Sequence, residues 1–213
     1  MQQRYAFQMK TPQIPQVSNW LAANPNPQGK GLRPVLDALI EAKQHCVVQH
    51  KQIHQISAEL FTSLLILESQ IRFKPVFEKP YWLYQKNGQY HLSLIHPQQW
   101  SYQQAGDYVG ECQLHTDLTW SLELSDETLN NPRLMAHFQQ RRTQFDEQLA
   151  TAVKFQDALP RYVSSFSYYS RVMASGLAHS LGASMQLGGI AELPYIVALQ
   201  QEQRSLISSS NDS

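Results

Sequence analysis

The stretch YWLYQKNGQYHLSLI, residues 81–95, constrains the fold more than any other part of the chain. Asn87 and Gly88 stand between two runs of alternating apolar and polar residues. This pattern is a strong signal of a β-hairpin, because a type I′ turn needs two residues that accept positive φ. A two-residue turn also fixes the register. The predicted pairs are Gln85–Tyr90, Leu83–Leu92 and Tyr81–Leu94 on one face, and Tyr84–His91 and Trp82–Ser93 on the other.

A second hairpin is predicted within YVGECQLHTDLTWSLEL, residues 108–124. A two-residue turn at Thr116 and Asp117 would leave the apolar residues of the two strands on different faces. A three-residue turn keeps them together, and a slip of one residue would bury the polar set instead. The three-residue turn sets Leu114 opposite Trp120 and Cys112 opposite Leu122. The two hairpins together predict a four-stranded antiparallel β-meander.

Two helices are predicted before the sheet, over residues 33–42 and 44–71. The longer one carries an apolar stripe at helical spacing, which can cover the face of the sheet that holds Leu83 and Leu92. The opposite face is too aromatic to stay in water, so we expect the C-terminal helices or a partner to cover it. The stripe is Ile53, Ile56, Leu60, Leu64, Leu67 and Ile71, and the opposite face carries Trp82, Tyr84, His91, Ile95 and Val109.

The chain after residue 125 reads as helical. Asn131 before Pro132 is a typical N-cap and first turn, and it predicts a helix over 132–157. Pro160 permits a new start, and a second helix is predicted over 161–187. The fold class is therefore α+β, with N-terminal helices, the antiparallel sheet and a C-terminal helical extension. The predicted layout is an irregular arm (1–18), an α+β core domain (19–125), a helical extension packed on the core (126–204) and a disordered tail (205–213).

The twenty residues from Val172 to Ala191 contain no charged side chain. A helix of that length could span a bilayer. Four glycines, three serines, a histidine and a glutamine weaken that interpretation. The small residues Ala174, Ala178 and Gly182 recur every fourth position and would let another backbone approach closely. We therefore expect a water-soluble protein whose 161–187 helix packs against the 132–157 helix or against a second copy.

The segment NPNPQGKG, residues 24–31, resembles a phosphate-binding loop only superficially. Asn24 stands where such a loop needs glycine, and Gly31 stands where it needs Ser or Thr. No buried strand precedes it. We interpret the segment as a turn-rich lead-in to a helix, and we expect no nucleotide to bind at Lys30, although an anion could approach the helix N-terminus there.

Composition excludes several classes of partner. The 17 basic and 17 acidic residues cancel, so the chain has no long-range field to attract nucleic acid or an anionic membrane. The two cysteines, Cys46 and Cys112, form neither a disulfide framework nor a metal motif. The first residues lack the apolar core of a signal peptide. These features predict a cytoplasmic protein of bacterial type, whose low charged fraction of 16% favours burial of its surface against a partner.

No catalytic or metal-binding motif is apparent. His50 and His54 have helical i, i+4 spacing, but no carboxylate or cysteine stands at an offset that would complete a metal site. Asp117 and Thr116 are residue types that turns favour, and Ser93 lacks the context of a hydrolase nucleophile. We expect no metal and no cofactor.

Several short motifs in one order resemble an uncharacterised bacterial family, known as a domain of unknown function. The similar elements are NPNPQGKG, Arg72-Phe73-Lys74-Pro75, Tyr81-x-Leu83-Tyr84, Leu92-Ser93-Leu94 with Pro97 and Trp100, and Asp117-x-Thr119-Trp120. The resemblance covers residues 19–124 and implies no activity. It implies that NPNPQGKG belongs to the structural signature of the family and is not a nucleotide loop.

These observations favour a non-catalytic interaction or scaffold protein, which works through a protein partner or by self-association. The alternative is a small-ligand-binding protein or enzyme with a site near the second face of the sheet. The candidate ligand or partner residues are Trp82, Tyr84, His91 and Lys30, and the candidate helix-packing residues are Ala174, Ala178 and Gly182. A concave pocket at the first set would favour the alternative, whereas a flat or buried face would favour a scaffold.

Overall fold

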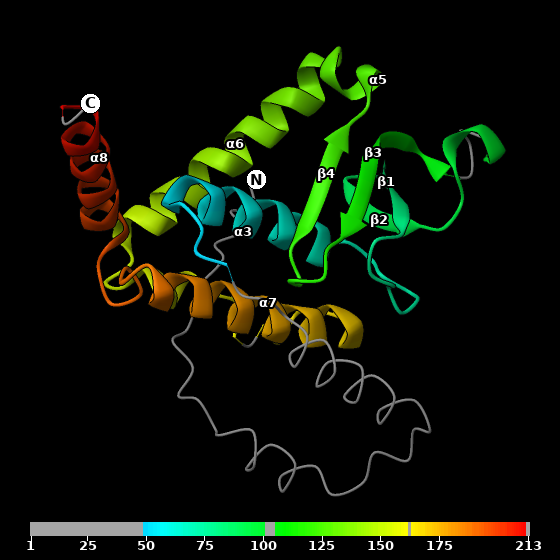
Figure 1. Cartoon of the computed structure of the whole chain (residues 1–213). Helices are drawn as coiled ribbons and strands as arrows, with labels where there is room; N and C mark the ends of the chain where they lie inside the picture. Colours follow the sequence, from blue (N-terminus) through cyan, green and yellow to red (C-terminus); the bar gives the residue numbers. More distant parts are fainter. Residues whose placement is uncertain (1–48, 101–104, 162, 212–213) are drawn as a thin grey trace, which may run out of the picture. The chain divides into compact units, whose positions relative to one another are not determined.

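The structure is a computed structural model that describes residues 49–100, 105–161 and 163–211, with side chains to residue 204 (Figure 1). All of these belong to one compact unit, residues 39–213. The predicted arm, the predicted helix over 33–42, Cys46 and Lys30 lie outside the described residues.

The fold class is α+β, as the sequence predicts. Four strands form one antiparallel sheet, with helices before and after it. The elements are α3 (Ile53–Leu67), β1 (Pro80–Lys86), β2 (Gln89–Ser93), the 3-10 turn η1 (Pro97–Gln99), β3 (Asp107–Leu114), β4 (Trp120–Leu124), α5 (Asp126–Leu129), α6 (Pro132–Thr151), the 3-10 turn η2 (Phe155–Ala158), α7 (Tyr168–Leu187) and α8 (Tyr195–Asn211).

Both predicted hairpin registers are confirmed within the strands. The first hairpin contains every predicted pair except Tyr81–Leu94, because β2 ends at Ser93. The second sets Leu114 opposite Trp120 across a three-residue turn. The turn ends on Leu118, whose φ of 68° is in the left-handed region that this loop length uses.

The strand order is β2-β1-β3-β4, so the sheet is not the predicted meander. The second hairpin joins the first through β1 rather than through β2. Turn chemistry and alternation specify the pairing inside each hairpin, but they carry no information about which edge the next hairpin takes. The connection from Ser93 to Asp107 is long enough to bring the chain back past β1.

A β-bulge corrects the predicted position of Val109. Tyr84 pairs with Tyr108 but Leu83 pairs with Gly110, so Val109 is the extra residue of β3. Its side chain is fully buried in the main core rather than on the Tyr84 face. Gly110 is required next to it, because an added Cβ would lie 2.1 Å from the backbone oxygen of Glu123.

Helix α3 covers the apolar face of the sheet, and its predicted stripe is buried except for Leu64, which is half-buried. The Oγ of Ser63 accepts a hydrogen bond of 2.9 Å from the Trp120 N–H of β4. Within the described residues the helix is shorter than predicted, since residues 49–52 are not helical and Gln70 pairs with the edge of β2. Tertiary contacts explain the late start, since the Gln49 carbonyl accepts a 2.8 Å hydrogen bond from Ser184 of α7.

The C-terminal helices differ from prediction at their ends. Asn131 caps α6 as predicted, accepting from the backbone N–H groups of Arg133 and Leu134. That helix stops at Thr151, because the chain turns through η2 to bond with the segment before α8. Helix α7 begins at Tyr168, behind a Ser167 cap, and it packs mainly against α3 rather than against α6.

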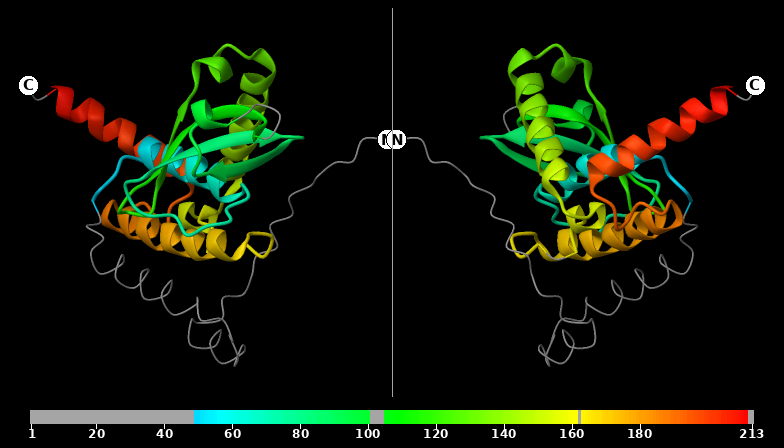
Figure 2. Two further views of the ribbon diagram at one scale, coloured as in Figure 1. Left: turned by 90° about the vertical axis from the view of Figure 1, so that its right-hand side faces the viewer. Right: turned by 90° about the vertical axis from the view of Figure 1, so that its left-hand side faces the viewer.

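Helix α8 continues to Asn211, where the sequence predicts a disordered tail from residue 205. Figure 2 shows its C-terminal part extending away from the sheet. Throughout the part of the chain that the structure describes, no helix combines the length and apolar character that crossing a bilayer requires.

Candidate functional site

The second face of the sheet is covered around Tyr84 by the connection that follows β2. Tyr84 is only 1% exposed, and its hydroxyl donates a 3.0 Å hydrogen bond to the Ile95 carbonyl of that connection. The ring of Trp100 packs on Tyr84 with centroids 5.6 Å apart. The sequence predicts that the C-terminal helices or a partner cover this face, but at Tyr84 the connection after β2 covers it.

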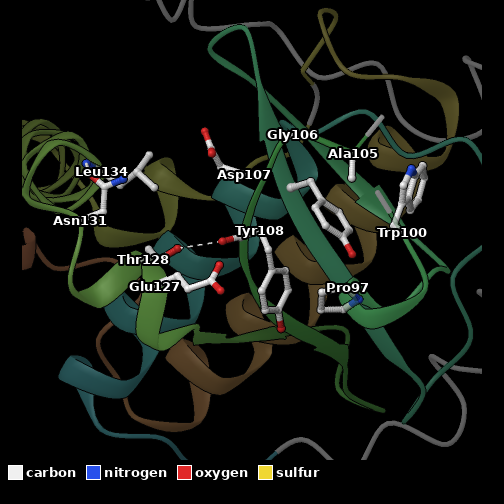
Figure 3. A pocket seen from close by; sticks show the side chains of 11 residues that line it. Pro97, Trp100, Ala105, Gly106, Asp107, Tyr108, Glu127, Thr128, Asn131 and Leu134 are labelled. Carbon is white, nitrogen blue, oxygen red and sulfur yellow. Dashed lines mark hydrogen bonds between the residues drawn. The ribbon is translucent and has the colours of Figure 1, made fainter. Parts of the chain in front are cut away.

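An open cleft of about 210 Å³ lies at the edge of this cover (Figure 3). It combines aromatic rings with carboxylates and hydroxyl and amide groups. The connection, β3 and the start of α5 and α6 all contribute to it. Its lining residues are Tyr84, Pro97, Trp100, Ala105, Gly106, Asp107, Tyr108, Glu127, Thr128, Asn131 and Leu134.

Backbone geometry at two points positions the cleft. Gly106 has a φ of 85°, and an added Cβ would lie 2.4 Å from the Gln85 carbonyl, so glycine lets the chain turn tightly into β3. On the other side, Ser125 and Thr128 both donate hydrogen bonds to the Tyr108 carbonyl, at 3.3 and 3.1 Å. These bonds fasten α5 to β3 and hold Glu127 near Tyr108, as Figure 3 shows.

The aromatic groups of the site are uncharged at neutral pH. Burial, and then the negative charge of Glu111, raises the pKa of Tyr108 to about 12. Burial, and then the positive charges of Lys86 and Arg72, lowers the pKa of His91. His91 stacks on Tyr84 with centroids 5.5 Å apart and an interplanar angle of 17°. The charged groups that line the cleft are the half-buried Asp107 and the exposed Glu127.

The structure brings only part of the predicted site together. Tyr84 lines the cleft and His91 stacks behind it, but Trp82 lies in a neighbouring cluster, with its ring 5.2 Å from that of His96. The buried Nε1 of Trp82 has no hydrogen-bond partner among the described residues. Lys30 falls outside the described residues. Sequence reasoning missed Trp100, Tyr108, Asp107 and Glu127, because only the β1–β3 pairing and the path of the connection bring them beside Tyr84.

Sequence reasoning also missed a polar cluster at the β3–β4 turn, formed by Lys51, Glu59 and Asp117. The Nζ of Lys51 lies 2.5 Å from a carboxylate oxygen of Glu59 and 2.5 Å from one of Asp117. Asp117 accepts from the Thr119 N–H and hydroxyl as well, as its turn position predicts. Burial favours neutral Lys51, but the hydrogen bonds from its ammonium to both carboxylates outweigh it and raise the Lys51 pKa. The cluster joins the segment before α3 to the β3–β4 turn.

The predicted helix-packing residues lie in a packed layer. Ala174 and Ala178 of α7 are buried, at 1% and 7% exposure. Gly182 is half-buried, and an added Cβ would lie 3.3 Å from the Leu159 side chain. The stripe of small residues on α7 therefore packs against other parts of the same chain, including the segment before α7.

The structure also places the cysteine and the two histidines that the sequence analysis considered for chemistry and that lie within the described residues. Cys112 is fully buried, and burial raises the pKa of its thiol. His50 and His54 are exposed, and His50 lies before α3 begins, so the helical pair does not form. Within residues 49–100, 105–161 and 163–211, no group of three His, Cys, Asp or Glu side chains is placed to hold a metal ion.

Residues 42–139 match the model of a family described as a protein of unknown function (DUF2452). This part of the chain is similar to that uncharacterised family. The resemblance seen in the sequence is thereby confirmed, although the match begins after NPNPQGKG. The DUF2452 match runs from α3 into α6 and contains the entire cleft, whereas α7 and α8 lie outside it. No curated protein and no solved structure matches the chain.

Proposed function

We propose that this is a non-catalytic interaction protein that binds a partner protein at the cleft beside Tyr84. The observation that carries the proposal is the row of rings from Trp100 through Tyr84 to Tyr108 at an open surface. Both outer rings pack on Tyr84 at 5.6 Å and remain half-buried. Aromatic side chains with one packed and one accessible side are enriched at protein interfaces, where they supply rigid contact area.

The size of the cleft favours a side chain of a partner over a whole metabolite. Sites for small molecules and cofactors usually enclose about 300–1,000 Å³. This cleft, at about 210 Å³, falls below that range and is open to solvent. The same connection also exposes two apolar side chains outside the cleft lining, Leu94 at 60% and Ile95 at 41%.

The experiment is a peptide selection on the full-length protein. Random peptides displayed on phage are selected on the wild type and counter-selected on Trp100→Ala. We expect peptides that bind the wild type and lose at least about tenfold in affinity on Trp100→Ala, as truncation of an aromatic anchor costs. The matched control is Val153→Ala, which removes another exposed apolar side chain outside the cleft.

Two results would count against the proposal. One is the absence of any enriched peptide, and the other is binding that Trp100→Ala and Val153→Ala affect equally. Circular dichroism of both variants checks that each is folded. Sedimentation of the wild type and Trp100→Ala separates a different partner from a second copy, because only self-association through the cleft would make the mass depend on Trp100.

A further inference from the structure

The charge on the cleft is one-sided. Among the described residues that line it, two carry carboxylates, Asp107 and Glu127, and none carries a basic side chain. Glu111 and Glu123 lie directly opposite each other on the neighbouring exposed surface of β3 and β4. Like charges placed opposite each other in a sheet are unfavourable, and a bound cation would relieve that repulsion. The positive charges of Lys86 and Arg72 act on the His91 ring behind Tyr84, whereas Glu111 and Glu123 act on Tyr108, so it is the Tyr108 side of the cleft that favours a positive group.

The aromatic rings favour the same kind of ligand. A cation near the face of Trp or Tyr is attracted by the ring quadrupole, with Trp the best of the aromatic residues. Trp100 and Tyr108 both line the cleft, and Tyr84 forms its buried base. Because the Tyr108 pKa is raised to about 12, its ring is a neutral phenol throughout the physiological range.

From this geometry we propose that the cleft binds a single Lys or Arg side chain of the partner protein, held against Trp100 and Tyr108 and opposite the Glu127 carboxylate. The inference rests on the proposed interaction role and specifies its chemistry. A cleft of about 210 Å³ can admit one long side chain, whose methylene groups contact the rings while the charged end meets the carboxylate.

The competing ligand class is an anion, because α6 begins at the cleft and a helix N-terminus attracts negative charge. Two observations disfavour it. The Oδ1 of Asn131 already accepts from the backbone N–H groups of Arg133 and Leu134, at 3.1 and 3.3 Å. The carboxylates of Asp107 and Glu127 line the same space and would repel an anion.

The test is a nuclear magnetic resonance titration of the full-length protein with blocked amino acids. The Trp100 indole signal, identified by its loss in Trp100→Phe, reports on the cleft. The cationic probes are N-acetyl-lysine amide and N-acetyl-arginine amide. Norleucine and citrulline derivatives are their uncharged counterparts, and inorganic phosphate is the anionic probe. We expect saturable shifts with the cationic probes and about two- to fivefold weaker binding of the uncharged ones, as cation–π contacts at exposed sites contribute.

Two variants then test whether the Glu127 carboxylate contacts the cationic probe. Glu127→Gln should weaken the lysine probe about two- to fivefold at low salt and leave norleucine unchanged, since an exposed ion pair contributes that little. Glu147→Gln is the matched control, an exposed glutamate at the other end of α6. Equal binding of norleucine, preferential binding of phosphate, or no shift with any probe would each overturn the proposal.

The two proposals fail in different ways. Selected peptides that need Trp100 but contain no Lys or Arg would leave the interaction role standing and remove the selectivity for a cation. Binding of the lysine probe without any selected peptide would instead leave a cation site and remove the proposed partner.

Discussion

Glu202 of α8 accepts a 3.0 Å hydrogen bond from the backbone N–H of Ile53, the first residue of α3. The N-cap residue Gln52 makes no side-chain cap, so α3 takes its capping group from a residue 149 positions further along the chain. A carboxylate at this position pairs an unbonded N–H and also favours the positive end of the helix dipole. One side chain therefore links the first residue of α3 to the C-terminal helix α8.

Replacing Glu202 with Ala should lower the free energy of unfolding by about 0.5–2 kcal/mol, the usual cost of losing an N-cap. Urea denaturation followed by circular dichroism measures it. Gln203→Ala is the matched control, because Gln203 is the next residue of α8 and is exposed. Equal costs for the two variants would show that Glu202 does not cap α3.

The Lys51–Asp117 contact gives stability that depends on pH. Burial of Asp117 favours its neutral form, but hydrogen bonds from Lys51 and Thr119 outweigh that effect and lower the Asp117 pKa. The unfolded chain, with an ordinary pKa of about 3.9, therefore binds more protons than the folded chain at acidic pH. The stabilisation is complete above the unfolded pKa and is lost as the pH falls through the folded one.

The variant Asp117→Asn removes the charge and keeps an oxygen that can accept from Thr119. It should cost about 1.5–3 kcal/mol at pH 7, the usual contribution of a hydrogen bond to a charged group. The cost should shrink as the pH is lowered below about 4, because the unfolded wild-type chain then binds a proton at Asp117 that the folded chain binds only at lower pH. Chemical denaturation of both proteins from pH 3 to pH 8 measures the difference, and a cost that stays constant over this range would contradict the assignment.

Local chemistry explains which parts of the fold could be predicted. Asn87 and Gly88 encode their own turn, and Asn131 and Pro132 encode their own helix start, so both were found without tertiary information. The strand order was not, because it depends on how the segment after Ser93 crosses the sheet. The sequence also does not predict the start of α3, because Gln49 and Lys51 bond to distant elements and their segment lies outside the helix.

In the candidate site, too, contacts within one hairpin could be predicted from the sequence, whereas contacts between separate segments could not. Tyr84 and His91 were placed together because they face each other across one hairpin. Trp100, Tyr108 and Glu127 come from three separate segments, and their meeting depends on the β1–β3 pairing and on the bonds from Ser125 and Thr128 to Tyr108. No periodicity in the sequence reports such contacts. Val109 was placed on the wrong face for a related reason, since a bulge shifts the alternation by one residue.

Close approach of two strands predicts the effect of Gly110→Ala. The added Cβ would lie 2.1 Å from the Glu123 carbonyl oxygen, which belongs to the backbone of the paired strand and cannot move alone. We expect a loss of about 3 kcal/mol of stability, at the upper end of overpacking costs. Gly88→Ala is the comparison, since Gly88 has open space but a φ of 77°, and it should lose only about 1 kcal/mol from the left-handed backbone. Thermal and urea denaturation that rank the two in the opposite order would refute the steric argument.

The small residues of α7 predict the outcome of a test of helix packing. Ala178 is 7% exposed in a helix that packs on α3, so Ala178→Leu must displace neighbours and should destabilise the protein by about 1–3 kcal/mol. Ser175→Leu places the same side chain at an exposed position of the same helix and should change stability by about 0.5 kcal/mol or less. Urea denaturation compares them. Because Ala178 is already buried within its own chain, sedimentation should give the same mass for wild type and Ala178→Leu, and a shift toward a smaller species would instead place a second copy against α7.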